Sequence, residues 1–404
     1  MMRIQSLSIH ADHLSRWCAV ALGFSIPISV AADNVLLVLI AGTWLASGRY
    51  RDKLRLIRDH PLSRAALLLF ALLALGTAYG VGAPADARAY LGKYADLLFV
   101  PILLWIFRDP AARRSGVYAF SASLLLVLLL SFLMKFGALP AGGIFHGDSS
   151  NPVAFKQYLT HNILIAYGAF VFTQLAAQAA TPCWRRAWIA AALLSAFNVV
   201  FMVPGRTGLL VLCALALYAG YRAFAWRGLA VAAASVAALG IALVLVPGVF
   251  PDRLQVAAQE FAQWQSGKPA QDATGLRLEF YRNTLSIIAD HPLLGVGTGG
   301  FPKAYADKVS GTGMAETRNP HNEFLHITAQ LGIAGLAALL WLFWQQWRCS
   351  AELATPLEGD LARGLVMTMT LGCMFNSLLL DHTEGLLYAW LTGLLYGGLK
   401  SGDG

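Results

Sequence analysis

An arginine lies in a very short polar turn between two apolar runs, in the sequence Pro204-Gly205-Arg206-Thr207-Gly208. We expect this turn to open a helix, where unpaired backbone N–H groups and the positive end of the helix dipole favour an anion. A guanidinium adds a bidentate donor, so Arg206 is suited to bind a phosphate. The alternative is an arginine that extends to lipid head groups, as arginines flanking membrane spans commonly do. Both interpretations fit the sequence.

A histidine stands at the start of a long apolar run. His321 follows Asn319 and Pro320, which predict a helix N-terminus with Asn as N-cap and Pro as the first helical residue. His321 would then lie in the first helical turn, where the helix dipole disfavours an imidazolium. A neutral imidazole can accept a proton, as a general base must. The alternative is an interfacial histidine that hydrogen-bonds to a loop.

Two further arginines, Arg277 and Arg282, fall in a segment whose apolar residues recur at helical spacing. Five residues at about 100° each place the two arginines ~140° apart around a helix. They could flank a ligand from two sides, or only one could point inward. The alternative for both is a solvated or head-group-contacting face.

Other local patterns do not indicate a cofactor or a metal. The glycines of 295–300 match G-x-G-x-x-G, but they follow a predicted helix rather than a strand. We interpret this segment as a flexible return of the chain. His321 and His326 are five residues apart, not the four of a zinc-binding H-E-x-x-H helix. We therefore predict no metal and no cofactor.

Several polar residues fall within or beside apolar segments, where polar side chains commonly hydrogen-bond between helices. We predict such bonds for Asp96, His161, Asn162, Asn198 and Asn376. A weaker site candidate at the last outer turn consists of Asp381, His382 and Glu384.

The composition indicates which elements carry these residues. Of the 404 residues, 57% are hydrophobic and only 13% are charged, whereas about a quarter of the residues in soluble domains are charged. This deficit excludes an ordinary soluble enzyme and indicates a membrane protein. The net charge of +8 does not indicate a nucleic-acid partner, because the basic residues lie in short clusters between apolar runs.

The apolar segments predict an all-α, polytopic membrane protein with about 12 transmembrane helices. The segments are 17–30, 34–47, 62–80, 90–107, 115–135, 157–178, 187–203, 208–224, 229–250, 322–347, 362–381 and 384–399. The chain then divides into helices 1–9 (1–250), a large outer loop (251–320) and helices 10–12 (321–404). Within the loop we predict helices near 253–266 and 274–290.

The basic residues predict the orientation. With the N-terminus inside, the inner connections carry most arginines and lysines, with the largest cluster in 49–64. The short outer connections carry only Arg88, Lys93, Lys135, Lys156 and Arg206. This asymmetry places both termini in the cytoplasm and the long loop on the opposite side.

Three motifs together resemble the O-antigen ligase and polymerase superfamily. The stretches 275–281 (GLRLEFY) and 290–297 (DHPLLGVG) are similar to its signature loop, and 320–325 (PHNEFL) is similar to its histidine motif. The arginine turn at 204–208 is similar to the family's arginine at the start of the eighth span. The motifs cover about 204–345, whereas the first 200 residues resemble the family only in topology.

The resemblance implies an inverting, metal-independent glycosyltransferase of the bacterial inner membrane with its active site facing the periplasm. It would transfer an O-antigen glycan from undecaprenyl diphosphate to lipid A–core oligosaccharide in lipopolysaccharide biosynthesis. Carried over residue by residue, Arg206 and Arg277 bind the diphosphate, with Arg282 as a further contact. His321 is the general base, catalytic together with Arg206, and Asn322 orients the acceptor. The implied partners are the lipid-linked donor, lipid A–core and membrane lipids, and we expect a monomer.

Two alternatives stay open at this point. An O-antigen polymerase of the same superfamily uses the same donor but extends another lipid-linked glycan. Polymerases often carry a second sizeable outer loop, so the small segment 137–156 favours a ligase. A secondary transporter also places arginines near the middle of the membrane, but it would show two related halves, and the sequence shows no internal repeat.

Overall fold

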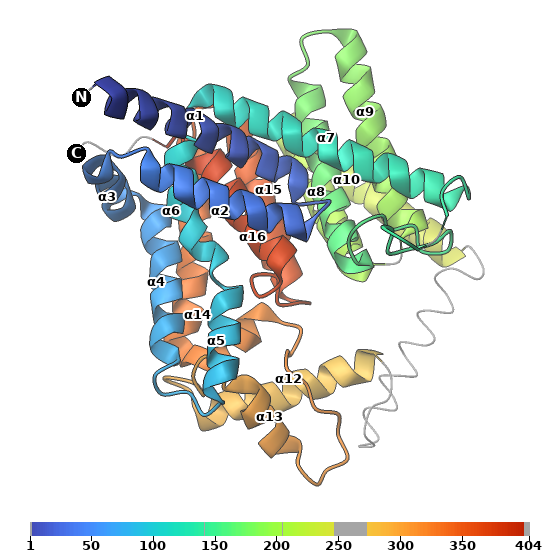
Figure 1. Ribbon diagram of the computed structural model, residues 1–404. Helices are drawn as coiled ribbons and strands as arrows, with labels where there is room; N and C mark the ends of the chain where they lie inside the picture. Colours follow the sequence, from blue (N-terminus) through green and yellow to red (C-terminus); the bar gives the residue numbers. More distant parts are fainter. Residues whose placement is uncertain (1, 141, 204, 246–272, 400–404) are drawn as a thin grey trace.

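The computed structural model describes residues 2–140, 142–203, 205–245 and 273–399 (Figure 1). These residues form helices and contain no β-strand, which confirms the all-α class. The helix predicted near 253–266 lies outside the described residues.

The helices follow one another along most of the chain. The α-helices are α1 Met2–Ser25, α2 Val30–Ala46, α3 Tyr50–Asp59, α4 Pro61–Gly76, α5 Pro84–Lys93, α6 Asp96–Ile106, α7 Pro110–Lys135, α8 Tyr158–Ala177, α9 Pro182–Phe197, α10 Arg206–Leu245, α12 Ala273–Asp290, α13 Phe301–Val309, α14 Glu323–Cys349, α15 Pro356–Cys373 and α16 His382–Tyr396. A π-helix, η1 Asn198–Met202, continues α9, and a 3-10 helix, η2 Ser350–Glu352, continues α14.

Every predicted apolar segment overlaps a helix, and the chain is a polytopic membrane protein. Within the described residues, six helices are long and apolar enough to cross a membrane, or up to seven if the bent pair α2 and α3 forms one span. This number is lower than the twelve predicted, because helices such as α4 (16 residues) and α16 (15 residues) are short for a span. The exact number of spans is therefore not confirmed.

Two predicted spans, 208–224 and 229–250, fall in α10, which turns sharply at Phe224 and Ala225. Ala225 has a φ of 50°, in the left-handed region. The backbones of Gly220 and Gly228 approach so closely across the turn that a Cβ on either would overlap the other. Small residues thus let the two limbs of α10 pack together, as they do between membrane helices generally.

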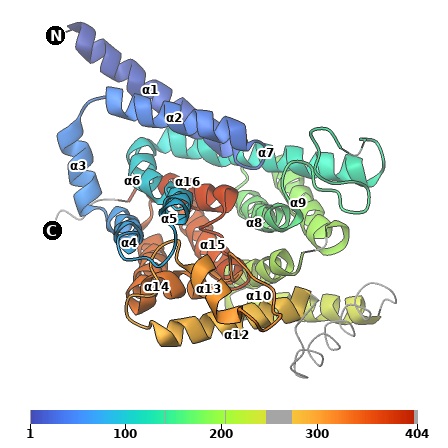
Figure 2. The same ribbon diagram turned by 60° about the horizontal axis from the view of Figure 1, so that its bottom comes forward.

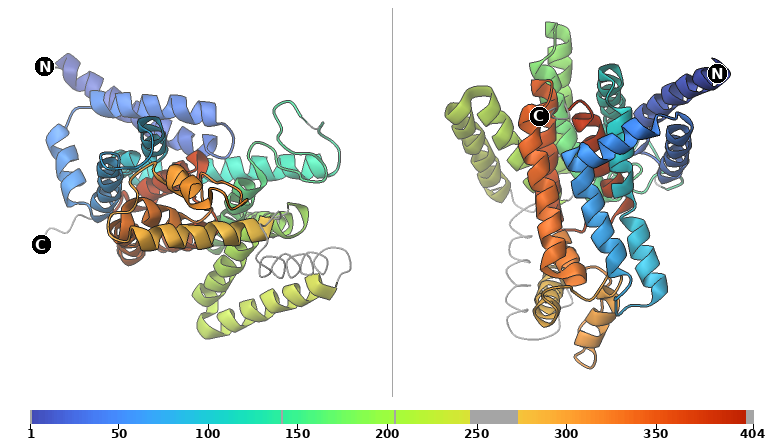
Figure 3. Two further views of the ribbon diagram at one scale, coloured as in Figure 1. Left: turned by 90° about the horizontal axis from the view of Figure 1, so that it is seen from below. Right: turned by 90° about the vertical axis from the view of Figure 1, so that its left-hand side faces the viewer.

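The helix α16 is the centre of the bundle, and all of its residues from Thr383 to Tyr396 are buried. Figure 3 shows the other helices surrounding it. Trp390 on α16 donates to the carbonyl of Ala19 in α1 (2.7 Å) and packs edge-on against Phe107 at the end of α6 (5.9 Å between ring centroids). These contacts join the first and last helices of the chain.

The glycine-rich segment is tied to α14, where that helix is kinked at Gly332 (φ 64°). In an uninterrupted helix the N–H of Ile333 would bond the carbonyl of Ala329. Here it donates to the carbonyl of Pro292 instead (2.9 Å), and the Ala329 carbonyl accepts from Val296 (2.9 Å). The kink therefore provides backbone partners for the segment that follows α12.

The prediction of a flexible return at 295–300 is wrong, because backbone hydrogen bonds fix this segment to α4 and α14. Gly297 donates to the carbonyl of Gln330 (2.9 Å), and the next residue, Thr298, donates to the carbonyl of Gly76 in α4 (3.0 Å). A Cβ at Gly297, whose φ is 79°, would overlap the backbone of Gly80. These glycines allow a close backbone approach between α4 and α14, so they fix the loop to the bundle.

The predicted helix at 274–290 is present as α12, Ala273–Asp290. It lies across one end of the bundle, and α13 packs against it (Figures 1 and 2). Phe280 and Ile287 of α12 form a small separate core with Phe301 and Tyr305 of α13. The loop helices thus face the helix starts at this end, which contain the predicted site residues.

Candidate active site

His321 lies just before α14, not in its first turn as predicted. The N-cap is Asn322, whose side-chain oxygen accepts from the N–H of Leu325 (3.0 Å), so the helix begins at Glu323. The predicted cap, Asn319, instead accepts from the N–H of His321 (2.8 Å). This bond holds His321 at a φ of 56°, in a left-handed conformation that few non-glycine residues adopt.

The imidazole of His321 belongs to a chain of three polar side chains. Its Nδ1 lies 3.1 Å from Oδ1 of Asn376, and Nδ2 of Asn376 donates to Oδ2 of Asp381 (3.1 Å). An amide oxygen can only accept, so Nδ1 of His321 carries the hydrogen. The lone pair of the neutral ring is then on Nε2, as a general base requires.

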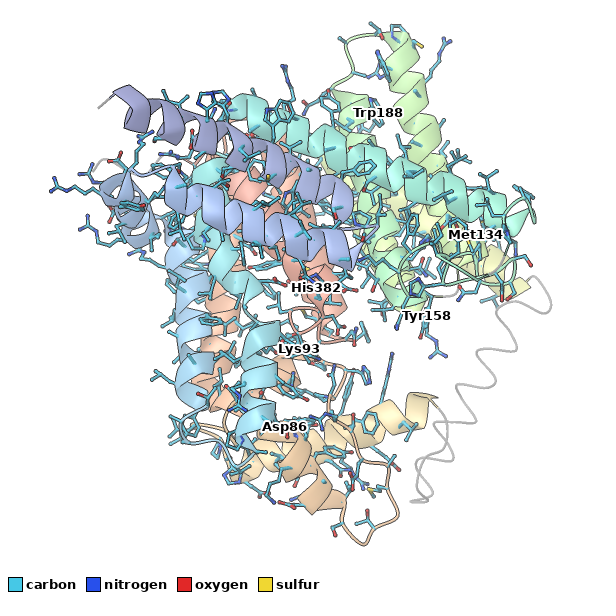
Figure 4. The ribbon with its side chains drawn as sticks, in the orientation of Figure 1. Asp86, Lys93, Met134, Tyr158, Trp188 and His382 are labelled. Carbon is cyan, nitrogen blue, oxygen red and sulfur yellow. The ribbon has the colours of Figure 1, made fainter. Side chains whose placement is uncertain are left out.

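Asp381 ends this chain as the N-cap residue of α16. Burial raises the pKa of its carboxyl group, and the charge of Lys93, the hydrogen bond from Asn376 and the charge of His321 oppose that shift. Figure 4 shows Lys93 at the end of α5 and His382, next to Asp381, at the start of α16. A carboxylate at 381 can stabilise an imidazolium at 321 through the amide between them.

Tyr281 joins the loop helix α12 to this site. Its hydroxyl lies 3.2 Å from the carbonyl oxygen of His321 and 3.1 Å from that of Met374. Burial raises the pKa of Tyr281, so the phenol keeps the proton that it donates. Asn322 donates to the same Met374 carbonyl (3.0 Å). The start of α14, the end of α15 and α12 therefore meet at His321.

Arg277 and Arg282 occupy different faces of α12. Arg277 is half-buried, one helical turn before Tyr281, and its charge opposes the burial-raised pKa of that tyrosine. Arg282 is exposed, and its charge opposes the burial-raised pKa of Tyr305 in α13. With a separation of ~140° around the helix, Arg277 lies on the side of Tyr281 and Arg282 toward Tyr305.

Arg206 is the first residue of α10, as predicted, and is exposed. Gly205 and Gly208 pack so closely on Asn162, near the start of α8, that a Cβ at either would overlap this residue. Nδ2 of Asn162 also donates to the carbonyl of Val203 (3.0 Å). The turn before Arg206 is therefore fixed to the start of α8.

Buried polar contacts bring the starts of α8 and α16 together. Thr160 donates to Oε1 of Glu384 (2.6 Å), and Nζ of Lys156 lies 3.1 Å from the hydroxyl of Thr383. Glu384 and Lys156 are both buried. Arg206 consequently opens α10 at the same end of the bundle as the His321–Asn376–Asp381 chain.

The start of α14 has a second buried anchor. Glu323 accepts from the hydroxyl of Tyr94 (2.7 Å) and from the N–H of Leu379 (3.0 Å). His326, one turn further along, is fully buried, and its ring packs edge-on against Phe301 (5.4 Å). These contacts fix the position of the helix that follows His321.

The predicted interhelical bond is confirmed for His161 and Asn198, which pair at 3.0 Å. Asn162 bonds to Val203 and Asn376 to His321, and both of these partners lie just outside helices. Sequence patterns missed the role of Tyr281, which falls in the segment whose apolar residues recur at helical spacing. They also left Asp381 a weaker candidate, because no local pattern links it to a residue 60 positions earlier. Within the described ranges, no group of three or more His, Cys, Asp or Glu residues is arranged to hold a metal.

Residues 189–340 match the model of the family described as O-antigen ligase. A Haemophilus influenzae protein described only as uncharacterized is 24% identical over 253 residues, which cover 60% of this chain and 61% of that protein. The chain thus spans about three fifths of that relative's length. Residues 189–340, which include the three candidate arginines and His321, are thus the part of this polytopic membrane protein that matches the O-antigen ligase family.

Proposed function

We propose that this protein transfers an O-antigen glycan from undecaprenyl diphosphate to lipid A–core oligosaccharide. The match of residues 189–340 to the O-antigen ligase family supports a glycan-transferring enzyme with lipid-linked substrates. The observation that carries the proposal is the hydrogen-bond chain from His321 through Asn376 to Asp381. It leaves Nε2 of His321 as a proton acceptor, next to α12.

In the proposed reaction, Nε2 of His321 accepts the proton of an acceptor sugar hydroxyl. The hydroxyl oxygen attacks the anomeric carbon of the donor as the bond from that carbon to the diphosphate oxygen breaks. The stereochemistry at that carbon inverts, and undecaprenyl diphosphate leaves. The imidazolium that forms is stabilised by its Nδ1–H bond to Asn376 and by the charge of Asp381.

The leaving diphosphate gains negative charge, which cationic donors stabilise in a site with little water. Arg277 is the first candidate, because it lies on the same face of α12 as Tyr281. Arg206 opens α10, where the helix dipole adds to its charge. Arg282 is a weaker helper, because it lies toward α13.

We assign Asn322 a role beside the base. Its Oδ1 and Nδ2 already bond Leu325 and Met374 within the protein. The remaining lone pair of Oδ1 is the group that would orient the acceptor hydroxyl. The same two bonds hold the backbone at His321, so replacing Asn322 should affect both functions.

The proposal includes the predicted topology. The protein lies in the bacterial inner membrane with about twelve spans, both termini are in the cytoplasm, and the site faces the periplasm. The clusters of basic residues on the side of the termini support this orientation.

A reconstituted transfer assay tests the chemistry. The assay combines the purified protein with a purified undecaprenyl-diphosphate glycan and lipid A–core, in detergent solution with a chelator present. We expect His321→Ala to abolish transfer, whereas His146→Ala, an exposed histidine in the loop before α8, should leave it unchanged. Full transfer by His321→Ala would exclude the base role. A product in which only the lipid-linked glycan grows would indicate a polymerase.

A further inference from the structure

A cavity of about 940 Å³ lies at the end of the bundle opposite α12. It is bounded by the start of α7, the connection between α8 and α9, the start of α15 and the end of α16. Figure 4 labels Trp188, one of its lining residues, on α9 in the upper part of the molecule. The cavity falls within the usual size range of small-molecule sites. None of its lining residues belongs to the candidate active site.

The wall of the cavity combines aliphatic side chains with interfacial aromatic ones. Leu175 of α8 and Leu394 of α16 line its interior. At its edge, the rings of Trp184 and Trp188 stack at 6.3 Å, and Trp184 and Tyr118 are 62% and 50% exposed. Tryptophan and tyrosine concentrate where membrane lipids meet water, because one end of each ring system is apolar and the other is polar.

The charges on the wall leave a net positive site. Arg113 is paired with Glu358 at 2.6 Å, and both side chains are nearly buried. Its NH1 group also donates to the carbonyls of Phe107 and Arg108 (3.0 Å each). The neighbouring Arg114 is exposed and lines the same cavity, and no carboxylate in the described part of the chain pairs with it.

We infer that this cavity binds one anionic phospholipid of the cytoplasmic leaflet. The acyl chains lie between α7, α8 and α16, the glycerol region contacts Trp184 and Trp188, and the phosphate meets Arg114. The adjacent basic residues Arg185 and Arg186, which follow Trp184, add to the attraction for a net negative head group. The site is separate from the proposed donor diphosphate site, which lies at the other end of the bundle.

Native mass spectrometry of the full-length protein in detergent tests the inference, with dioleoyl phosphatidylglycerol and dioleoyl phosphatidylcholine as probes. We expect one phosphatidylglycerol to bind about fivefold or more tightly than phosphatidylcholine. Arg114→Gln should remove that preference, because one arginine near a lipid surface contributes about a factor of five. The control Arg51→Gln, which removes an exposed arginine from α3, should retain the preference.

A second variant tests the cavity itself. Ala122 of α7 lines the cavity and is exposed, so Ala122→Trp should fill the space and lower the binding of both lipids. Ala234→Trp places the same ring on the exposed second limb of α10 and should not. Three results would overturn the inference. They are equal binding of the two lipids, unchanged binding by Arg114→Gln and Ala122→Trp, and a polyprenyl phosphate as the only copurified lipid.

Discussion

Asn376 provides the sharpest test of the base assignment, because it touches no substrate in the proposed reaction. Asn376→Ala removes the bond from Nδ1 of His321 (3.1 Å) and the bond to Asp381 (3.1 Å). The imidazole would then lose the partner that fixes its tautomer. The developing imidazolium would also lose its link to the carboxylate charge.

The magnitude follows from the change of charge during the reaction. A hydrogen bond between neutral groups contributes about 1 kcal/mol, and one to a charged group about 1.5–3 kcal/mol. Only the difference, about 0.5–2 kcal/mol, is specific to the transition state. It corresponds to a turnover number roughly 2- to 30-fold lower. The KM for the lipid-linked donor should change little, because the arginines that bind it are intact.

The assay is the reconstituted transfer reaction with both substrates varied, so that kcat and KM are separated. Asn376→Asp keeps an acceptor for Nδ1 of His321 and should recover part of the lost rate. Asn34→Ala, at an exposed position of α2, is the matched control. An unchanged kcat in Asn376→Ala would refute the assignment, as would a loss that appears only in the donor KM.

Arg277→Ala should lower the transfer rate about 100-fold or more, as the loss of a donor to a developing anion does. Arg282→Ala should lower the rate less than about tenfold. Equal losses in the same assay would contradict the assignment of the two arginines to different faces of α12. Gly297→Ala should lower the free energy of unfolding by about 1–3 kcal/mol more than Gly311→Ala does. Both positions have a positive φ, but only at Gly297 would a Cβ overlap neighbouring backbone atoms. Denaturant unfolding in detergent measures this difference, and equal losses of stability would refute the close packing at Gly297. Since burial raises the pKa of Asp381, its carboxylate is protonated at a higher pH than an ordinary aspartate as the pH falls. As the pH is lowered, the transfer rate should therefore begin to fall at a higher pH than the protonation of an ordinary aspartate would cause. This fall should be absent from Asp381→Asn. An unaltered pH–rate profile in that variant would exclude Asp381 from the hydrogen-bond chain.

Local sequence patterns predicted the features of the fold that depend mainly on neighbouring residues. The apolar stripe at 274–290 corresponds closely to α12, Ala273–Asp290, because its spacing alone determines which face is buried. Arg206 begins α10 as expected, since a Pro-Gly turn before an apolar run leaves few other conformations. Polar residues inside apolar segments found partners because unbonded polar groups are costly there.

Contacts between distant segments were not predictable in this way. The bond from His321 to Asn376 spans 55 residues, and nothing in either local sequence specifies the other. The start of α14 was predicted too early, because Asn319 and Asn322 are both good N-caps. In the structure Asn319 also accepts from the hydroxyl of Ser377 (2.8 Å), which lies 58 residues later, and the local sequence does not specify that contact.

The most direct test of the proposed function is the length of the glycan that accumulates on undecaprenyl diphosphate in cells lacking this protein. If the protein transfers completed chains to lipid A–core, long glycans should accumulate on the carrier and the lipopolysaccharide should lack O-antigen. Wild-type protein should restore both, and the His321→Ala variant should restore neither. Accumulation of single repeat units on the carrier would contradict the account and indicate a polymerase.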